Sequence, residues 1–193
     1  MVIKAIIFDC FGVLITPGRT VLYQDYPQFK TEIHDLELQS DYGMISRQQF
    51  DDLLARLTGL KLKEVEPRYW DVNIRNKPAI TWIRELKLLG KYKTGLLSNV
   101  GIGWLSDFFS KTELNDLFDT VILSSNVGII KPDPRSFELM AKQLGVSPHE
   151  CVMIDDTPSN IDGAGHADMQ GIVFKSVHQA QAELKKVLES DYA

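Results

Sequence analysis

Two apolar segments of the chain end in acidic residues whose carboxylates could act as a nucleophile or as metal ligands. Asp9 follows the apolar run 3–8, and the pair Asp155 and Asp156 follows the run 151–154. A short apolar run bounded by turn residues is typical of a buried strand, and α/β proteins bind ligands at the ends of such strands. An aspartate after a strand is also a common turn former, so Asp9 alone leaves both interpretations open.

Other polar residues follow the same plan. Ser98 and Asn99 end a third apolar run, and Lys131 stands before Pro132 in a segment that lies between them and the acidic pair. Phosphoryl transfer through a covalent intermediate needs a carboxylate nucleophile, a divalent cation that neutralises charge, and donors to the phosphoryl oxygens. The residue types Asp, Ser, Asn and Lys supply the nucleophile, the donors and the metal ligands.

An acid, then a serine, then Lys-Pro, then an acidic pair, each at a strand end or in a loop, resembles the haloacid dehalogenase-like hydrolase superfamily over essentially the whole chain. The resemblance extends to the branch with a small helical (C1-type) cap. It implies that Asp9 is the nucleophile that forms an aspartyl-phosphate, that Ser98 binds the phosphate, and that Lys131 pairs with the nucleophile and the phosphate. Asn99, next to Ser98, is expected to add an amide donor for the substrate.

The resemblance also implies a Mg²⁺ cofactor held by Asp9, Asp156 and the backbone carbonyl of Phe11. Mg²⁺ is bound through one or two carboxylates, water and substrate phosphate, so adjacent acids that face a third carboxylate are suitable. Asp155 is either a second ligand from the pair or an acceptor that orients the ligands. Three neighbouring carboxylates would repel one another without a cation, which favours a metal over the alternative of an N-cap before the helix near Pro158.

Phe11 departs from the family pattern. Family phosphatases usually carry a second Asp at this position, whose side chain protonates the leaving group and later activates water. Proton transfer by a positioned side chain is worth about 10² to 10⁴ in rate, so its loss is expected to slow the enzyme unless the cap or the substrate supplies the proton. Tyr23, His34, Asp41 and Arg75 are cap residues that could contribute, although each is more commonly a surface or packing residue.

Three functions follow from this departure, and we expect the first. The chain is a Mg²⁺-dependent phosphatase that acts on a small phosphomonoester, for example a sugar phosphate. The second is a 2-haloacid dehalogenase, because those metal-independent enzymes also carry an aromatic residue here, with Ser and Asn in place of Asp155 and Asp156. The third is a catalytically inactive protein that binds a phosphorylated ligand or another protein. No motif identifies the substrate or the oligomeric state.

The elements that must position these residues can be located from hydrophobic periodicity. Five short apolar stretches are expected to be strands, at 3–8, 94–98, 120–123, 151–154 and 171–174. Most are separated by segments of helical period, of which the clearest are 79–89, 136–144 and 180–188. Strands that alternate with helices predict right-handed crossovers and a doubly wound α/β fold with a parallel, Rossmann-like sheet.

Residues 16–78 lack strand-like alternation and contain a strongly helical pattern over residues 50–57. Ser46 is a suitable N-cap for this helix, and Gln49 three residues later completes a capping box. A helical insertion between the first and second strands does not extend the sheet. We therefore predict an α/β core domain made of residues 1–15 and 79–193, and a helical cap of residues 16–78 that the resemblance places over the active site.

Composition narrows the remaining function classes. The 193 residues are 44% hydrophobic and 24% charged with a net charge of −5, values that suit a globular protein with one core domain and a small insertion. The lack of a long basic run argues against nucleic acid as a partner. We expect a cytoplasmic protein without membrane contact, because no secretory signal pattern and no apolar run of roughly 18 residues occurs. Cys10 and Cys151, in apolar strand segments, are interpreted as reduced, buried thiols.

The tryptophans and one asparagine complete the sequence-based expectations. Trp70, Trp82 and Trp104 are widely spaced, so we expect no stacking platform; Trp82 fits the apolar face of its helix, and Trp104 is expected to pack behind the phosphate-binding loop. Asn160 matches a family position that often orients the metal ligand, or else it lies on a helix surface.

Overall fold

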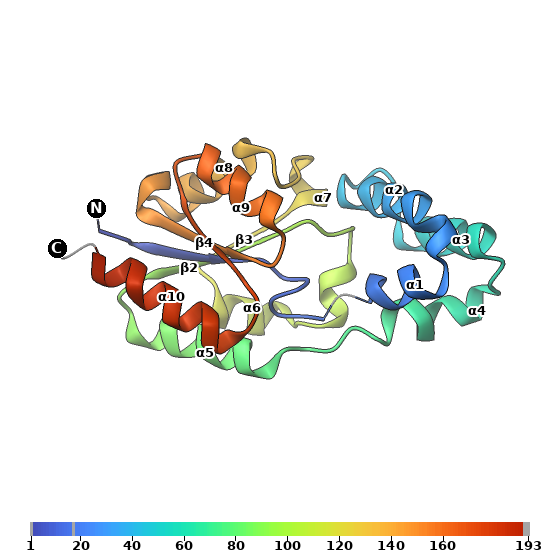
Figure 1. The fold of residues 1–193 in the computed structure, drawn as a ribbon, viewed down its shortest axis with the longest axis horizontal. Coiled ribbons are helices and arrows are strands. Elements are labelled where there is room, and N and C mark those ends of the chain that lie inside the picture. The colour runs from blue at the N-terminus through green and yellow to red at the C-terminus, as the bar shows by residue number, and fades with distance from the viewer. Residues whose placement is uncertain (1, 17, 191–193) are drawn as a thin grey trace.

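The core of the structure is a parallel β-sheet with the strand order β3-β2-β1-β4-β5. The computed structural model describes residues 2–16 and 18–190, and Figure 1 shows the sheet in the left half of the molecule. The strands are β1 (Ala5–Phe8), β2 (Lys93–Ser98), β3 (Thr120–Leu123), β4 (Cys151–Asp155) and β5 (Gln170–Val173). Each overlaps one of the five predicted segments, with bounds that differ by at most two residues.

Helices cover both faces of the sheet (Figure 1). They are α8 (Pro134–Leu144) and α9 (Pro158–His166) on one face, and α5 (Lys77–Leu89), α6 (Lys111–Leu117) and α10 (Val177–Ser190) on the other. Successive side chains of a strand point to opposite faces, so Ile6 and Phe8 join one hydrophobic layer and Ile7 joins the other. The doubly wound α/β fold predicted from the sequence is thereby confirmed. Short helical turns complete the core: η3 (Trp104–Asp107), α7 (Ser124–Val127) and η4 (Pro148–Glu150).

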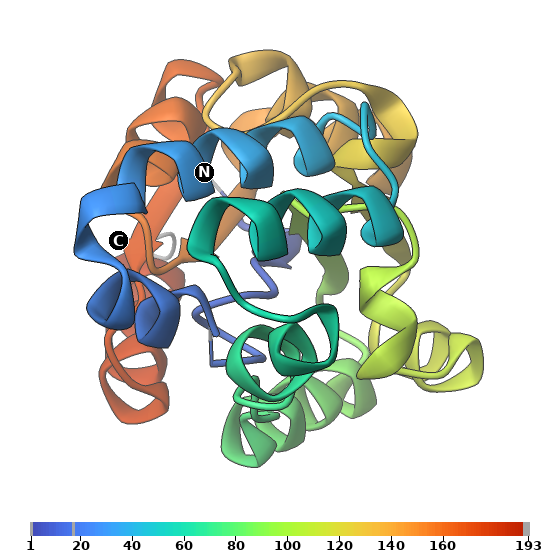
Figure 2. The same cartoon turned by 90° about the vertical axis from the view of Figure 1, so that its right-hand side faces the viewer.

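The chain between β1 and α5 forms a separate helical group at the carboxyl end of the strands (Figure 1). It comprises α1 (Arg19–Asp25), η1 (Pro27–Phe29), α2 (Lys30–Asp41), α3 (Arg47–Thr58), α4 (Leu62–Val65) and the π-helical turn η2 (Glu66–Trp70). Figure 2 shows α2 and α3 side by side in front of the sheet. The predicted capping box is confirmed, because Ser46 Oγ accepts from the Gln49 N–H at 3.2 Å and Gln49 Oε1 accepts from the Ser46 N–H at 2.8 Å.

The hydrophobic core of this helical group includes the buried side chains of Val100 and Trp104 from the α/β core. Phe50 is fully buried and packs against Tyr69, Trp70 and Trp104. Trp70 and Trp104, which are far apart in the sequence, meet edge to face in this buried cluster with centroids 4.5 Å apart; the expectation that the tryptophans form no stacking platform stays a prediction. Trp82 takes its predicted place, in contact with Phe8 of the sheet. Trp104 therefore couples the helical group to the core.

The two segments that connect the helical group to the core run side by side. The Thr16 N–H donates to the Ile74 carbonyl at 2.9 Å, and the Asn76 N–H donates to the Leu14 carbonyl at 2.7 Å. These bonds join the entry and exit of the insertion close to the predicted boundaries at residues 16 and 78. The assignment of residues 16–78 as a cap domain stays a prediction.

Two expectations from composition can be compared with the structure. Cys10 and Cys151 are both buried and free, as predicted, and burial raises the pKa of both thiols. None of the helices in residues 2–16 and 18–190 combines the length and the hydropathy that crossing a membrane requires.

Candidate active site

Asp9 lies at the carboxyl end of β1, where the strand order of the sheet reverses. β1 pairs with β2 on one side and with β4 on the other, so Phe8 stands beside Leu96 and Ile154. The Asp9 N–H continues this ladder by donating to the Ile154 carbonyl at 2.9 Å. Open α/β sheets bind ligands in the crevice at such a switch point. The ends of three neighbouring strands therefore surround Asp9, which is buried.

Lys131 joins two of the predicted site carboxylates in a buried network. Its Nζ lies 2.7 Å from Oδ1 of Asp9 and 2.6 Å from Oδ2 of Asp155, and all three side chains are almost fully buried. Burial lowers the pKa of Lys131, but the carboxylates of Asp155 and Asp9 outweigh that effect and raise this pKa above its ordinary value. Lys131 is therefore a fixed positive charge next to the predicted nucleophile.

Asn99 ties the Lys131 loop to the end of β2. Asn99 Nδ2 donates to the Lys131 carbonyl and the Lys131 N–H donates to Asn99 Oδ1, both at 2.8 Å. The loop also rests on α9 at Gly163, where a Cβ would lie 2.3 Å from the Pro132 carbonyl oxygen. Asn99 thus positions Lys131, and its predicted role as an amide donor to the substrate stays a prediction. Sequence reasoning missed Gly163, whose only signal is a glycine inside a helical segment.

Asp155 accepts hydrogen bonds from three residues. Besides Lys131, the donors are Asn160 Nδ2, at 3.1 Å from both carboxylate oxygens, and the Thr157 N–H at 2.9 Å. Asp155 is fully buried, and Thr157 is the N-cap of α9, without a side-chain capping bond. Of the two roles predicted for Asp155, this geometry favours the acceptor that orients its neighbours, and it places Asn160 inside the site rather than on the helix surface.

Asp156 completes a cluster of three acids at the strand ends. Asp9, Asp155 and Asp156 each offer a carboxylate oxygen, and these oxygens lie within 4.8 Å of one another. Gly12, in the loop after Asp9, has a φ of +104°, and a Cβ there would lie 2.2 Å from Cγ of Asp156. The loop that contains Phe11, whose carbonyl is the other predicted ligand, therefore folds directly against the Asp156 carboxylate, and only glycine fits.

The acid cluster carries more negative charge than its lysine offsets. Burial raises the pKa of Asp9 to about 7, and the Asp155 carboxylate adds to this rise while Lys131 opposes it. Burial and the Asp155 carboxylate also raise the pKa of Asp156. A divalent cation would relieve this repulsion, and carboxylate oxygens are the ligands that Mg²⁺ prefers. The residues present at the site thus fit a bound Mg²⁺.

Ser98 and Phe11 occupy the places that the sequence predicts, at the ends of β2 and β1. Ser98 is 1% exposed, and its Oγ lies 3.5 Å from the Asn99 carbonyl, at the limit of a hydrogen bond. The Phe11 ring packs edge to face on Phe108, with centroids 5.9 Å apart. The Phe11 ring therefore stands at the position where family phosphatases usually carry a second aspartate.

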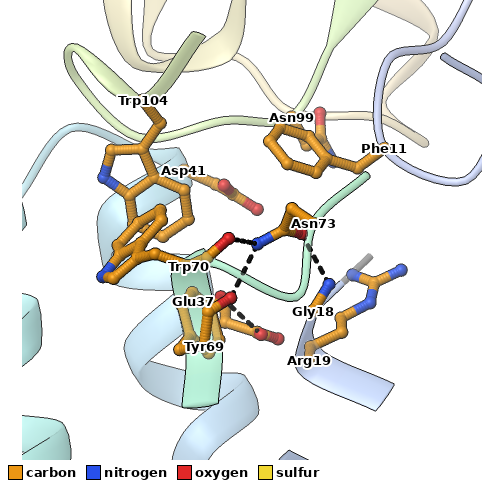
Figure 3. Close-up of a pocket in the computed structure, with 10 residues that line it drawn as sticks. All are labelled: Phe11, Gly18, Arg19, Glu37, Asp41, Tyr69, Trp70, Asn73, Asn99 and Trp104. Atoms are coloured by element: carbon orange, nitrogen blue, oxygen red, sulfur yellow. Dashed lines mark hydrogen bonds between the residues drawn. The ribbon is translucent and has the colours of Figure 1, made fainter. Parts of the chain in front are cut away.

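Two hollows lie between the strand ends and the helical group. A cleft of about 620 Å³ contains Asp9, Lys131 and Asn160 in its lining. A cavity of about 50 Å³, large enough for a few water molecules, extends along the helical group (Figure 3). The residues that line both hollows are Phe11, Arg19, Asp41 and Asn99.

A hydrogen-bonded network forms the wall of the cavity on the side of the helical group (Figure 3). Glu37 is 5% exposed and accepts from the hydroxyls of Tyr23 and Tyr69 at 2.7 and 2.9 Å. Asn73 accepts from the Gly18 N–H at 2.6 Å and donates to the Tyr69 carbonyl at 2.6 Å. Sequence reasoning missed Glu37, Asn73 and Gly18, because the contacts that assemble them join segments far apart in the chain.

The four residues of the segment 16–78 that were candidates for a proton donor do not all lie at the cleft. Tyr23, His34 and Asp41 line the cleft, whereas Arg75 pairs with Glu113 and lies over the Phe109 ring. The His34 side chain is 56% exposed and faces Glu37 at 3.8 Å. Arg75 therefore has a structural place outside the lining of the cleft, and the other three border it.

The fold and the site together define a Rossmann-like α/β protein with an acidic, lysine-containing site at the switch point of its sheet. The chain belongs to the haloacid dehalogenase-like hydrolase family, whose model matches residues 3–168. The predicted superfamily is thereby confirmed, and the protein is assigned to a family of hydrolases. The subtype of the cap stays a prediction.

Two curated relatives and one solved structure illustrate this membership. The chain is 28% identical to a glyceraldehyde 3-phosphate phosphatase of Pyrococcus furiosus, over 98% of this chain and 88% of the relative. It is 29% identical to a D-ribitol-5-phosphate phosphatase of Bacteroides thetaiotaomicron, over 82% of this chain and 85% of the relative. A HAD family enzyme of Bacteroides thetaiotaomicron in complex with magnesium and inorganic phosphate shares the fold, with a TM-score of 0.72 and 22% identity over 91% of this chain and 96% of that chain.

Proposed function

We propose that this protein is a Mg²⁺-dependent phosphatase that hydrolyses a small phosphomonoester through an aspartyl-phosphate on Asp9. The observation that carries the proposal is the network in which Lys131 bridges Asp9 and Asp155, with Asp156 beside them. This network combines a buried carboxylate, a cation and a set of oxygen ligands, which are the parts that phosphoryl transfer requires.

In the proposed reaction, a carboxylate oxygen of Asp9 attacks phosphorus and the bond between phosphorus and the ester oxygen breaks. Lys131 favours the ionised form of Asp9 and faces the charge on the phosphoryl group, and the Ser98 hydroxyl at the end of β2 donates to a phosphoryl oxygen. Water then attacks phosphorus, the bond from phosphorus to Asp9 breaks, and inorganic phosphate leaves. The two steps consume one water and restore the Asp9 carboxylate.

The residues that would hold Mg²⁺ are Asp9, Asp156 and the backbone carbonyl of Phe11, with Asp155 as a ligand or as the acceptor that orients them. The close fit of Gly12 against the Asp156 carboxylate supports this assignment, because it brings the Phe11 loop next to that acid. When bound, Mg²⁺ supplies positive charge that stabilises the negative charge of the transferring phosphoryl group.

The proposed substrate is a small sugar or polyol phosphate, held under a C1-type cap made of residues 16–78. Two relatives support this class, since they are named for the hydrolysis of glyceraldehyde 3-phosphate and D-ribitol 5-phosphate. The cleft supports it as well, because its lining includes the polar side chains Arg19, Tyr23, Lys30 and His34, which can form hydrogen bonds to hydroxyl groups.

The test is phosphate release from a panel of sugar, polyol and aryl phosphates in the presence of Mg²⁺. We expect turnover that EDTA removes and that Asp9→Asn abolishes. Asp162→Asn, a matched change at an exposed position on α9, should retain turnover. Absence of turnover with every ester would refute the proposal, and binding of a phosphorylated ligand without turnover would instead support an inactive, ligand-binding protein.

A second candidate is a 2-haloacid dehalogenase, which the aromatic residue at Phe11 favours. The acid cluster is the observation against it, because the resemblance associates dehalogenation with Ser and Asn at the positions of Asp155 and Asp156. Halide release from a 2-haloacid in the presence of EDTA would support this candidate, and we expect none.

A further inference from the structure

Resting on the proposed phosphatase function, we propose that the carboxyl group of Asp41, in the helical group, is the catalytic acid and base that replaces the missing aspartate at Phe11. Asp41 is the last residue of α2 and lines both the cleft that contains Asp9 and the adjoining cavity. Of the four residues that line both hollows, Phe11, Arg19 and Asn99 have no proton that they exchange readily near neutral pH. Asp41 is the one that can give and take a proton where the hollows meet.

The core fixes the position of Asp41. The Ser124 hydroxyl donates to the Asp41 carbonyl at 2.7 Å and accepts from the Val100 N–H at 2.9 Å, and Ser124 is 1% exposed. Two residues after Asp41, a Cβ at Gly43 would lie 2.8 Å from the Ser125 carbonyl oxygen. The end of α2 is thus packed tightly on α7, directly after β3, so the carboxyl group of Asp41 is held next to the strand ends.

The Asp41 carboxylate is free to react. Figure 3 shows it pointing into the cavity, and among residues 2–16 and 18–190 this carboxylate has no hydrogen-bond or ion-pair partner, since the bond from Ser124 goes to the Asp41 backbone carbonyl. Glu37, one turn earlier on α2, differs in this respect because both its oxygens accept from tyrosine hydroxyls. A general acid needs a labile proton that is not already committed to another group.

The other titratable cap residues at the cleft are less suited to the task. The Tyr23 hydroxyl donates to Glu37, and burial together with the Glu37 carboxylate raises the pKa of Tyr23 above its ordinary value. His34 lies with 56% of its side chain in solvent and faces the same glutamate. Neither residue lines the cavity that Asp41 and Phe11 both line.

The electrostatic surroundings of Asp41 suit proton transfer near neutral pH. Burial raises the pKa of Asp41 to about 7, the carboxylates of Glu37 and Asp9 add to the rise, and the cations Arg19 and Lys131 oppose it. A group with a pKa near the working pH is present in both its acid and its base form, which is the condition for efficient general acid–base catalysis. The geometry and the titration of the same side chain therefore agree.

The proposed steps balance in atoms and protons. As Asp9 attacks phosphorus and the phosphorus–ester oxygen bond breaks, the Asp41 carboxyl group gives its proton to the departing alkoxide, which leaves as an alcohol. The Asp41 carboxylate then removes a proton from water while the water oxygen attacks phosphorus. The bond from phosphorus to Asp9 breaks, phosphate leaves, and Asp41 is protonated again.

The test compares an alkyl phosphate, whose leaving group needs a proton, with 4-nitrophenyl phosphate, whose leaving group departs without one. Asp41→Asn should lower kcat for the alkyl ester by about 10² to 10⁴ and change kcat for the aryl ester far less. Glu37→Gln, one turn away in the same cavity wall, should change both values by a similar factor. Phe11→Asp should restore alkyl turnover in the Asp41→Asn background and add little to the wild type.

Each outcome is decisive for one of the two proposals. If the wild type with Mg²⁺ hydrolyses neither ester, the proposed phosphatase function fails. If it hydrolyses both, and Asp41→Asn lowers both kcat values equally or changes only KM, Asp41 binds substrate or maintains structure and the catalytic assignment is overturned. Should Asp41→Asn fail to fold, Phe11→Asp in the wild type decides, because a large gain confined to the alkyl ester would mean that no acid was in place.

Discussion

The titration of Asp41 predicts how the stability of the protein changes with pH, without reference to any substrate. Burial and the Glu37 carboxylate raise the pKa of Asp41 from 3.8 to about 7. The folded state therefore binds the Asp41 proton more tightly than the unfolded state does. Between these two pKa values stability falls as pH rises, and above pH 7 the full cost of the buried carboxylate remains. Asp41→Asn removes this dependence, so its stability relative to wild type should increase from pH 5 to pH 8.

The magnitude follows from the shift of the pKa. A shift of about three units corresponds to about 4 kcal/mol when the group is fully shielded from water. The Asp41 residue keeps part of its surface exposed to water, and water screens part of that cost. We therefore expect the stability of Asp41→Asn relative to wild type to increase by about 2 kcal/mol from pH 5 to pH 8. For a chain of this size, that gain corresponds to about 4–8 °C in Tm.

The assay is thermal or urea unfolding of wild type and Asp41→Asn at pH 5, 6, 7 and 8 with EDTA present, so that metal binding does not contribute. Asp35→Asn, an exposed change on the same helix, is the control and should follow the wild type at every pH. A difference between Asp41→Asn and wild type that stays constant with pH, or that shrinks toward pH 8, would refute the reasoning.

Three further predictions address the site and its support. Lys131→Met leaves two buried carboxylates without their cation and should cost about 3–5 kcal/mol in urea unfolding, whereas Lys87→Met removes an exposed ion pair with less than about 1 kcal/mol of effect. Gly12→Ala displaces the Asp156 carboxylate and should weaken Mg²⁺ binding by about 10- to 100-fold in calorimetry, whereas Gly90→Ala, also at positive φ but in open space, should leave binding unchanged. Phe50→Ala empties the centre of the aromatic cluster and should lower the free energy of unfolding by about 3–5 kcal/mol. Equal effects of the two lysine variants, equal effects of the two glycine variants, or a small loss for Phe50→Ala would count against the respective assignment.

The strands could be predicted from the sequence because both faces of this sheet are covered. The sequences of such strands are continuous apolar runs, which are easy to recognise between helical segments. The capping box at Ser46 and Gln49 was equally accessible, since all its atoms come from four consecutive residues. Local chemistry and burial on two sides therefore account for what the sequence reveals of the fold.

The positions of Asp9 and Ser98 could also be predicted, because the carboxyl ends of parallel strands meet at one edge of the sheet, whereas the position of Lys131, in the segment between α7 and α8, was implied only by the family resemblance. The partners of these residues could not. The choice of Asp155 as the second partner of Lys131, and the use of the Asn99 amide to hold the Lys131 backbone, depend on loop geometry within a few ångströms. Hydrophobic periodicity contains no information at that scale.

The wall formed by the helical group was the least accessible part. Arg19, Glu37 and Asp41 come from the first two helices of the insertion, and Trp104 comes from a core loop. Their meeting depends on the angles at which helices pack and on the contact between Trp70 and Trp104. Helix packing follows broad preferences rather than a residue code, so a sequence pattern does not determine which side chains converge.

Phe11 and Asp41 are best understood as a linked pair. An aspartate at position 11 would place another carboxylate near Asp9 and Asp41 and add to the repulsion in a site that already holds three acids. The aromatic ring removes that charge and adds apolar surface to the hollows that Asp41 lines, which favours the protonated form of Asp41. A proton donor in the helical group also requires that this group keep a fixed position on the core, and the bond from Ser124 to the Asp41 carbonyl provides such a constraint. The aromatic residue in the loop after β1 and the acid at the end of α2 are therefore consistent with one change, in which the role of proton donor and acceptor moves from position 11 to Asp41.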